Sequence, residues 1–145
     1  AEEALNRDLL MIELARDEGR RLEAYLDSLG FWTVGIGHLL GRGRRMLEIT
    51  ESECDALFNH DVAAAERLAE RLVPSYAALD DVRQRVLVNM AFNLGSKLGN
   101  FKATLAAIDR QDWEAAATQM GASLWAKQVG QRAVRLQEMM RTGTA

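Results

Sequence analysis

The spacing of apolar residues predicts helices over most of the chain. Near the start, apolar residues recur at intervals of four and three, which places them on one face of a helix; they are Leu5, Leu9, Ile12 and Ala15. Gly19 is expected to end this helix. In residues 20–40, aromatic and β-branched residues are interleaved with glycines, and this pattern is typical of a short antiparallel sheet with tight turns.

A capping box predicts where the longest helix begins. Thr50 and Glu53 can each satisfy a free backbone amide at a helix start. The apolar stripe that follows consists of Cys54, Phe58, Ala65, Leu68 and Leu72. Pro74 is expected to end the helix. Such a helix has about 22 residues and spans about 33 Å, which indicates a connection between two lobes.

The second half of the chain is predicted to be helical. Asp80 can cap a helix that closes at Gly95. The core face of this helix is expected to contain Val82, Val86 and Met90, with Phe92 or Asn93 nearby. Further helical segments are expected near residues 101–109, 112–120 and 130–141. In the last segment the inward residues are Ala133, Leu136 and Met140, and the solvated residues are Arg132, Arg135 and Arg141.

These elements predict a single α+β domain over residues 1–145 that is predominantly helical. A small lobe that contains the sheet is expected over residues 15–60. An all-helical lobe is expected over residues 61–145, and the first helix, over residues 1–14, can pack on it. The long helix after residue 50 is expected to join the two lobes.

Composition excludes several classes of protein. The chain has 145 residues, a net charge of -3, two histidines and a single cysteine. Cys54 is therefore expected to be a small buried apolar residue, and the lack of disulfides suits synthesis in a reducing cytoplasm. Zinc-ligand spacing is absent, so no metal is expected. The slightly acidic balance argues against a nucleic-acid binder, and no apolar run reaches the roughly 18 residues of a membrane-spanning helix.

Two carboxyl residues are the first candidates for chemistry. Glu18 lies at the end of the first predicted helix, Asp27 follows nine residues later in the predicted sheet, and Thr33 follows six residues after that. A glycosidase uses two facing carboxyls, one to protonate the leaving oxygen and one to activate water or stabilise the cationic sugar. Spacing alone favours a solvated surface pair, because the chain has 21 acidic residues. Nearby glycines at 30, 35 and 37 point instead to tight turns or a close backbone approach.

His38 and Asp61 form a second candidate pair. Asp61 falls on the apolar stripe of the longest predicted helix, where a carboxylate is costly unless it is paired. His38 closes the glycine segment and is the natural partner. The interpretation favoured by these residues is a structural ion pair, because nothing nearby resembles a Ser or Cys nucleophile that His38 could activate.

Seven segments carry a pattern that runs in order along nearly the whole chain. They are residues 16–19 (RDEG), 25–27 (YLD), 31–40 (FWTVGIGHLL), 57–62 (LFNHDV), 89–95 (NMAFNLG), 113–116 (WEAA) and 141–144 (RTGT). Together with Trp125, these segments resemble the T-even-type phage lysozymes, glycoside hydrolase family 24. Residues 31–40 are the most specific part of the resemblance.

The resemblance implies a muramidase that hydrolyses the β-1,4 bond between N-acetylmuramic acid and N-acetylglucosamine, with inversion and without a cofactor. It implies Glu18 as the general acid, Asp27 as the second catalytic carboxylate and Thr33 as a holder of the attacking water. The residues that fall on substrate-groove positions are Leu39, Phe92, Thr104 and Gln119. His38 and Asp61 fall on a buried ion pair, and Arg132 falls near the acid.

The resemblance also implies a biological setting. Its partner is the glycan strand of peptidoglycan, and a monomer that binds neither nucleic acid nor membrane is expected. Synthesis in a host cytoplasm, action on the cell wall in the periplasm and host cell lysis follow. One alternative is a non-catalytic or tail-associated peptidoglycan-binding module on the same fold, although both carboxyls are present. A helical interaction or DNA-binding protein is a second alternative, against which the acidic balance and the glycine segment speak.

Overall fold

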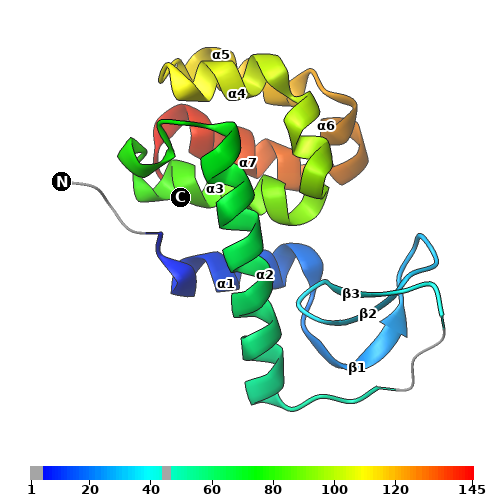
Figure 1. Ribbon diagram of the computed structural model, residues 1–145. Helices are drawn as coiled ribbons and strands as arrows, with labels where there is room; N and C mark the ends of the chain where they lie inside the picture. Colours follow the sequence, from blue (N-terminus) through cyan, green and yellow to red (C-terminus); the bar gives the residue numbers. More distant parts are fainter. Residues whose placement is uncertain (1–4, 44–46) are drawn as a thin grey trace. The chain divides into compact units, whose positions relative to one another are not determined.

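The structure is a computed structural model that describes residues 5–43 and 47–145; residues 1–4 and 44–46, which the predicted lobes include, lie outside the described part. Figure 1 shows helices and one small sheet. The first elements are α1 (Arg7–Glu18), β1 (Arg21–Leu26), β2 (Trp32–Gly35), β3 (His38–Gly41) and α2 (Glu51–Leu72). They are followed by η1 (Tyr76–Ala78), α3 (Asp81–Leu94), η2 (Gly95–Asn100), α4 (Lys102–Asp109), α5 (Trp113–Gly121), α6 (Leu124–Val129) and α7 (Gln131–Thr142). The predominantly helical α+β class is confirmed.

The described chain forms two compact units. Residues 7–64 make the sheet-containing unit, and residues 65–145 make the helical unit together with Leu5 and Asn6. Asn6 is tied to the helical unit because its N–H donates to the carboxylate of Asp81 over 2.7 Å. Helix α2 contributes its first part to one unit and its last part to the other.

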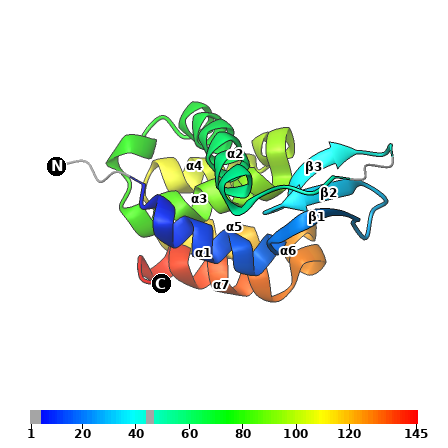
Figure 2. The same cartoon turned by 90° about the horizontal axis from the view of Figure 1, so that it is seen from below.

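The sheet of the first unit is antiparallel, with the strand order β1-β2-β3 (Figure 2). Tyr25 pairs with Thr33 across the first two strands, and Val34 pairs with His38 across the second two. Gly30 and Gly37 occupy the two connections with φ of +87° and +63°, a conformation that favours glycine. The predicted turn-rich sheet is therefore confirmed, and its glycines have a backbone reason.

Helix α2 begins at the predicted capping box. The N–H of Thr50 donates to Glu53 Oε1 over 2.9 Å, and the N–H of Glu53 donates to Thr50 Oγ1 over 3.0 Å. The helix has 22 residues, as predicted, and ends two residues before Pro74. Its fully buried stripe consists of Cys54, Phe58, Val62, Ala65 and Ala69. Leu68 and Leu72 are only half-buried at the edge of this stripe, so the predicted stripe is wrong over its second half.

The predicted inner face of α1 is wrong. The helix begins at Arg7, so Leu5 lies outside it, and Leu10 and Leu14 are the fully buried residues. Leu9 is 42% exposed and Ile12 is 67% exposed. Two apolar patterns with helical spacing overlap in this short segment, and periodicity alone does not distinguish which of them meets the core.

Helix α3 is the most buried element of the helical unit. The side chain of Asp80 accepts a hydrogen bond from the N–H of Arg83 over 3.1 Å, which confirms the predicted cap. Every residue from 84 to 91 is buried, so the predicted single core face is incomplete. The buried polar side chains of this stretch are Gln84, Arg85 and Asn89.

Among the described elements, α3 packs mainly against η2 and α7. The predicted segments near 101–109 and 112–120 are α4 and α5, whereas the six-residue helix α6 is not predicted. Helix α7 packs against α3, α5 and α6. Its Arg132 is buried rather than solvated, which corrects the prediction; its Nε donates to Asn89 Oδ1 over 3.0 Å. Among the described residues, no helix combines the length and the apolar character needed to cross a membrane.

Candidate active site

Glu18 is the last residue of α1 and packs against the turn between β2 and β3. The helix ends there because Gly19 adopts a φ of +81° and its N–H donates to the carbonyl of Ala15 over 2.8 Å. Gly37 lies so close to Glu18 that a Cβ at Gly37 would be 2.9 Å from Glu18 Oε1. The absence of a side chain at Gly37 therefore gives the Glu18 carboxyl its place.

Asp27 is fixed by the turn that follows β1. Its Oδ1 accepts the N–H of Leu29 over 2.9 Å and the N–H of Phe31 over 2.8 Å. Its own N–H donates to the carbonyl of Phe31 over 2.8 Å. This is the local side-chain-to-backbone bonding that Asp provides in turns. Within the described residues no hydrogen bond reaches Oδ2, so this oxygen is available to a ligand.

Thr33 lies in the central strand, where it pairs with Tyr25, and is only 4% exposed. Its hydroxyl donates to the carbonyl of Phe31 over 3.3 Å. The backbone of Phe31 therefore links the two side chains, because its N–H binds Asp27 and its carbonyl binds Thr33. The lone pairs of Thr33 Oγ1 remain able to accept a hydrogen bond.

Tyr25 belongs to this site and is missed by the sequence analysis. Burial raises the pKa of its hydroxyl; the cation of Arg21 opposes the rise, and the negative charges of Glu18 and Asp27 add to it. The Arg21 guanidinium lies 4.5 Å from the centre of the Tyr25 ring. The charges of both carboxylates therefore affect the ionisation of the same phenol. The sequence contains a signal for this residue. Side chains two residues apart in an extended segment point to the same face, and Tyr25 precedes Asp27 by two residues.

His38 and Asp61 meet within the same unit. His38 Nδ1 lies 2.7 Å from Asp61 Oδ2, and the two side chains are 24% and 23% exposed. The pair is half-buried, less buried than the resemblance implies. It joins the start of β3 to the middle of α2.

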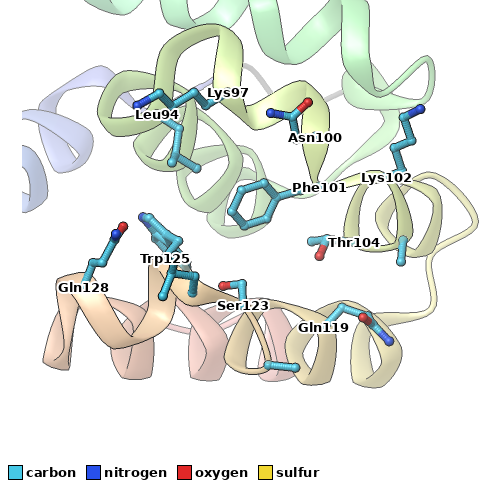
Figure 3. A pocket seen from close by; sticks show the side chains of 13 residues that line it. Leu94, Lys97, Asn100, Phe101, Lys102, Thr104, Gln119, Ser123, Trp125 and Gln128 are labelled. Carbon is cyan, nitrogen blue, oxygen red and sulfur yellow. The ribbon is translucent and has the colours of Figure 1, made fainter.

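The four predicted groove residues do not all line one pocket. Thr104 and Gln119 line a pocket of about 670 Å³ in the helical unit (Figure 3). Phe92, half-buried on α3, does not line this pocket. Leu39, on β3 of the other unit, is 57% exposed.

The pocket of the helical unit has an aromatic wall. The rings of Phe101 and Trp125 meet edge to face, with centres 6.1 Å apart and planes at 81°. Trp125 is held because its Nε1–H donates to Asn93 Oδ1 over 2.7 Å. The other lining residues are Leu94, Lys97, Asn100, Lys102, Ala103, Ala122, Ser123, Leu124 and Gln128. An aromatic surface beside hydroxyls and amides is suited to sugars and peptides.

No group of His, Cys, Asp and Glu in the described ranges is arranged to hold a metal ion. Glu18, at the end of α1, and Asp27, in the turn after β1, both belong to the sheet-containing unit. Glycoside hydrolases act with a pair of carboxyls.

Comparison with known proteins identifies the family. The profile of the Phage lysozyme family matches residues 15–141, and the chain belongs to this family. It is 34% identical to "Probable T4-type lysozyme 1" of Dictyostelium discoideum, covering 90% of this chain and 92% of that protein. It is 30% identical to "Endolysin" of Salmonella phage P22, over 72% of this chain and 73% of that protein. Membership of this family shows that the chain is a lysozyme, and lysozymes are glycoside hydrolases.

A phage structural protein is also related. The chain is 34% identical to "Pre-baseplate central spike protein Gp5" of Enterobacteria phage T4, over 95% of this chain but only 28% of that protein. A sequence related to this chain therefore forms part of a longer protein.

Proposed function

We propose that this lysozyme hydrolyses the β-1,4 bond between N-acetylmuramic acid and N-acetylglucosamine of peptidoglycan, with Glu18 as the general acid and Asp27 as the general base. The observation that carries the proposal is the pair of carboxyls around Tyr25. Glu18 packs on the turn at Gly37, and Asp27 is anchored by two backbone N–H groups. Both carboxyls influence the same phenol.

In the proposed reaction, Glu18 gives its proton to the glycosidic oxygen as the bond from that oxygen to the anomeric carbon breaks. A water attacks the anomeric carbon from the opposite face and loses a proton to Oδ2 of Asp27. The second hydrogen of this water points to the lone pairs of Thr33, whose own proton is engaged by Phe31. Exchange with solvent then restores the proton of Glu18 and removes that of Asp27.

Replacement of the two carboxyls tests these roles. General acid–base catalysis contributes about 10²–10⁴-fold, so Glu18→Gln and Asp27→Asn should each lower the release of reducing ends from peptidoglycan by at least about 100-fold. Thermal unfolding should show that both variants remain folded. Glu23→Gln, which removes an exposed carboxylate from β1 of the same unit, is the control. Activity of Glu18→Gln within about tenfold of the parent chain would contradict the general-acid role.

The stereochemical outcome tests the role of water separately. An inverting enzyme leaves room for water between the second carboxylate and the sugar, with carboxyls roughly 6.5–9.5 Å apart. Hydrolysis of a β-linked oligomer should then release the α-anomer first, as measured by proton NMR before mutarotation. If the β-anomer appears first, Asp27 acts as a nucleophile and Thr33 does not hold the attacking water.

We further propose that the protein is a monomer that acts in host cell lysis, after synthesis in the host cytoplasm, on the wall in the periplasm. The endolysin relationship supports this role. The relationship to the spike protein supports a tail-associated role as the second candidate. Immunodetection in purified phage particles distinguishes the two, because a lysis enzyme is absent from them and a tail component is present. Sedimentation analysis tests the monomer.

A further inference from the structure

The pocket of the helical unit carries an unusual share of the chain's lysines. The whole sequence contains three, Lys97, Lys102 and Lys127, and all its other cations are arginine or histidine. Lys97 and Lys102 both line the pocket, whereas no Asp or Glu is among its lining residues. The pocket therefore has a local charge of two positive groups in a chain whose net charge is -3.

These lysines are not engaged by the protein's own carboxylates. Within residues 5–43 and 47–145, none of the three forms an ion pair. The acidic residues of the same stretch of sequence have other partners. Asp109 accepts from Ser75, Asp112 caps α5, and Glu114 binds Arg141. The positive charge at the pocket is therefore available to an anionic ligand.

The shape of the pocket defines what such a ligand looks like. Figure 3 places Lys97 and Lys102 toward opposite ends of the wall that also carries Phe101, with their ammonium groups at the outer edge. Gln119, Ser123 and Gln128 lie on the facing wall. An elongated ligand with apolar parts, amide groups and acidic ends fits this combination, whereas a neutral sugar chain offers the two ammonium groups hydrogen-bond acceptors but no opposite charge.

Peptidoglycan carries its negative charges in one place. The lactyl carboxyl of each muramic acid is joined to a peptide as an amide, so the glycan strand is neutral and the free carboxylates belong to the peptide stems. We propose that Lys97 and Lys102 bind carboxylates of the peptide stem and make the enzyme prefer strands with ionised stems over amidated ones. This inference rests on the proposed hydrolysis of peptidoglycan.

The test compares two substrates that differ only in charge. Soluble glycan strands with intact stems are used as prepared, and a second portion has its stem carboxylates converted into primary amides with carbodiimide and ammonia. The parent chain should show a higher kcat/KM on the ionised strands. Because an exposed ion pair is worth about 0.2–1 kcal/mol, Lys97→Gln and Lys102→Gln should each lower kcat/KM on the ionised strands by up to about fivefold, mainly through KM.

Lys127→Gln is the matched control, since it removes the same charge from the same unit outside the pocket lining. It should keep the preference of the parent chain, whereas Lys97→Gln and Lys102→Gln should each reduce that preference. Equal cleavage of both strands by the parent, or an equal loss in Lys127→Gln, would overturn the inference.

A binding measurement separates this inference from the proposed function. The Nε1–H signal of Trp125 is followed by NMR while an acidic stem tripeptide, or its amidated form, is added to the full chain. The acidic peptide should shift the signal, and Lys97→Gln together with Lys102→Gln should abolish the shift. A parent chain that binds the peptide but releases no reducing ends would contradict the proposed function alone, whereas the absence of any shift would overturn the lysine site.

Discussion

At the scale of single residues, Gly37 determines where the Glu18 carboxyl can lie. It combines a φ of +63° with the close approach of Glu18, whereas Gly30 has a φ of +87° and nothing within 4 Å of an added Cβ. Alanine in the left-handed region costs roughly 1–2 kcal/mol, so Gly30→Ala and Gly37→Ala should both lower the free energy of unfolding. Only Gly37→Ala should also displace Glu18 and reduce activity by more than about tenfold.

Denaturant titration and reducing-end assays of the two glycine variants provide the measurement. Gly30→Ala serves as the control for backbone strain. If both variants retain the same activity, the contact between Gly37 and Glu18 has no bearing on catalysis.

Tyr25 reports the charges of the site. Burial and the two carboxylates raise the pKa of its hydroxyl, and Arg21 lowers it. Glu18→Gln removes a carboxylate that raises the pKa of Tyr25 and should therefore lower it, whereas Arg21→Gln removes a cation that lowers this pKa and should raise it. Part of the upward shift should persist in Glu18→Gln, since burial is its largest cause.

The titration is followed by the Cζ signal of ¹³C-labelled tyrosine in NMR, with Tyr76 as the second signal. Glu70→Gln, an exposed carboxylate of α2, should leave the Tyr25 midpoint unchanged. A midpoint that does not respond to Glu18→Gln would show that Glu18 and Tyr25 are not neighbours.

The sequence predicts which residues belong to the proposed site better than it predicts the hydrogen bonds that connect them. Glu18, Asp27 and Thr33 are candidates from spacing and resemblance alone. The links through the backbone of Phe31 depend on the turn that Asp27 closes, and the importance of Tyr25 depends on strand register. Both are consequences of folding that a one-dimensional pattern does not contain.

At the scale of elements, His38 and Asp61 connect β3 to α2 across a distance of 2.7 Å. Removal of one partner of a fully buried pair costs about 3–5 kcal/mol, and an exposed pair is worth about 1 kcal/mol or less. Since each side chain is about a quarter exposed, His38→Asn and Asp61→Asn should each cost an intermediate amount. The double variant should cost less than the sum of the two.

Urea titration of the four proteins in this double-mutant cycle gives the coupling free energy. His60→Asn, an exposed histidine on the same helix, should be nearly neutral. Strict additivity of the two substitutions would mean that the contact contributes nothing to stability.

Features whose signal lies within a few residues of sequence can be predicted. Features that depend on packing against distant parts of the chain cannot. The capping box of α2 and the Asp80 cap of α3 lie within a few residues of sequence and are found as predicted. The inner face of α1 and the burial of Arg132 depend on what packs beside them. Helix α6 has only six residues, too few for a periodic pattern to emerge.

At the scale of the whole molecule, the two units differ in how much core they contain. Of the thirty buried apolar residues among those described, twenty-two belong to residues 65–145 and eight to residues 7–64. The end of helix α7 is also held within the helical unit. Arg83 donates to the carbonyls of Met140 and Arg141, and its guanidinium lies over the ring of Trp113. Chains of about 60 residues bury too little surface to be more than marginally stable.

The two units should therefore differ when they are expressed separately. A fragment of residues 65–145 should retain helical structure and lose it in a cooperative thermal transition, because its core is formed within the fragment. A fragment of residues 7–64 should show no such transition, since its sheet is covered by few buried side chains. Circular dichroism at 222 nm for the helices and near-ultraviolet dichroism for the tryptophans measure both fragments, with the full chain as reference. A cooperative transition in the fragment of residues 7–64, or its absence in that of residues 65–145, would show that stability is not distributed as the buried residues are.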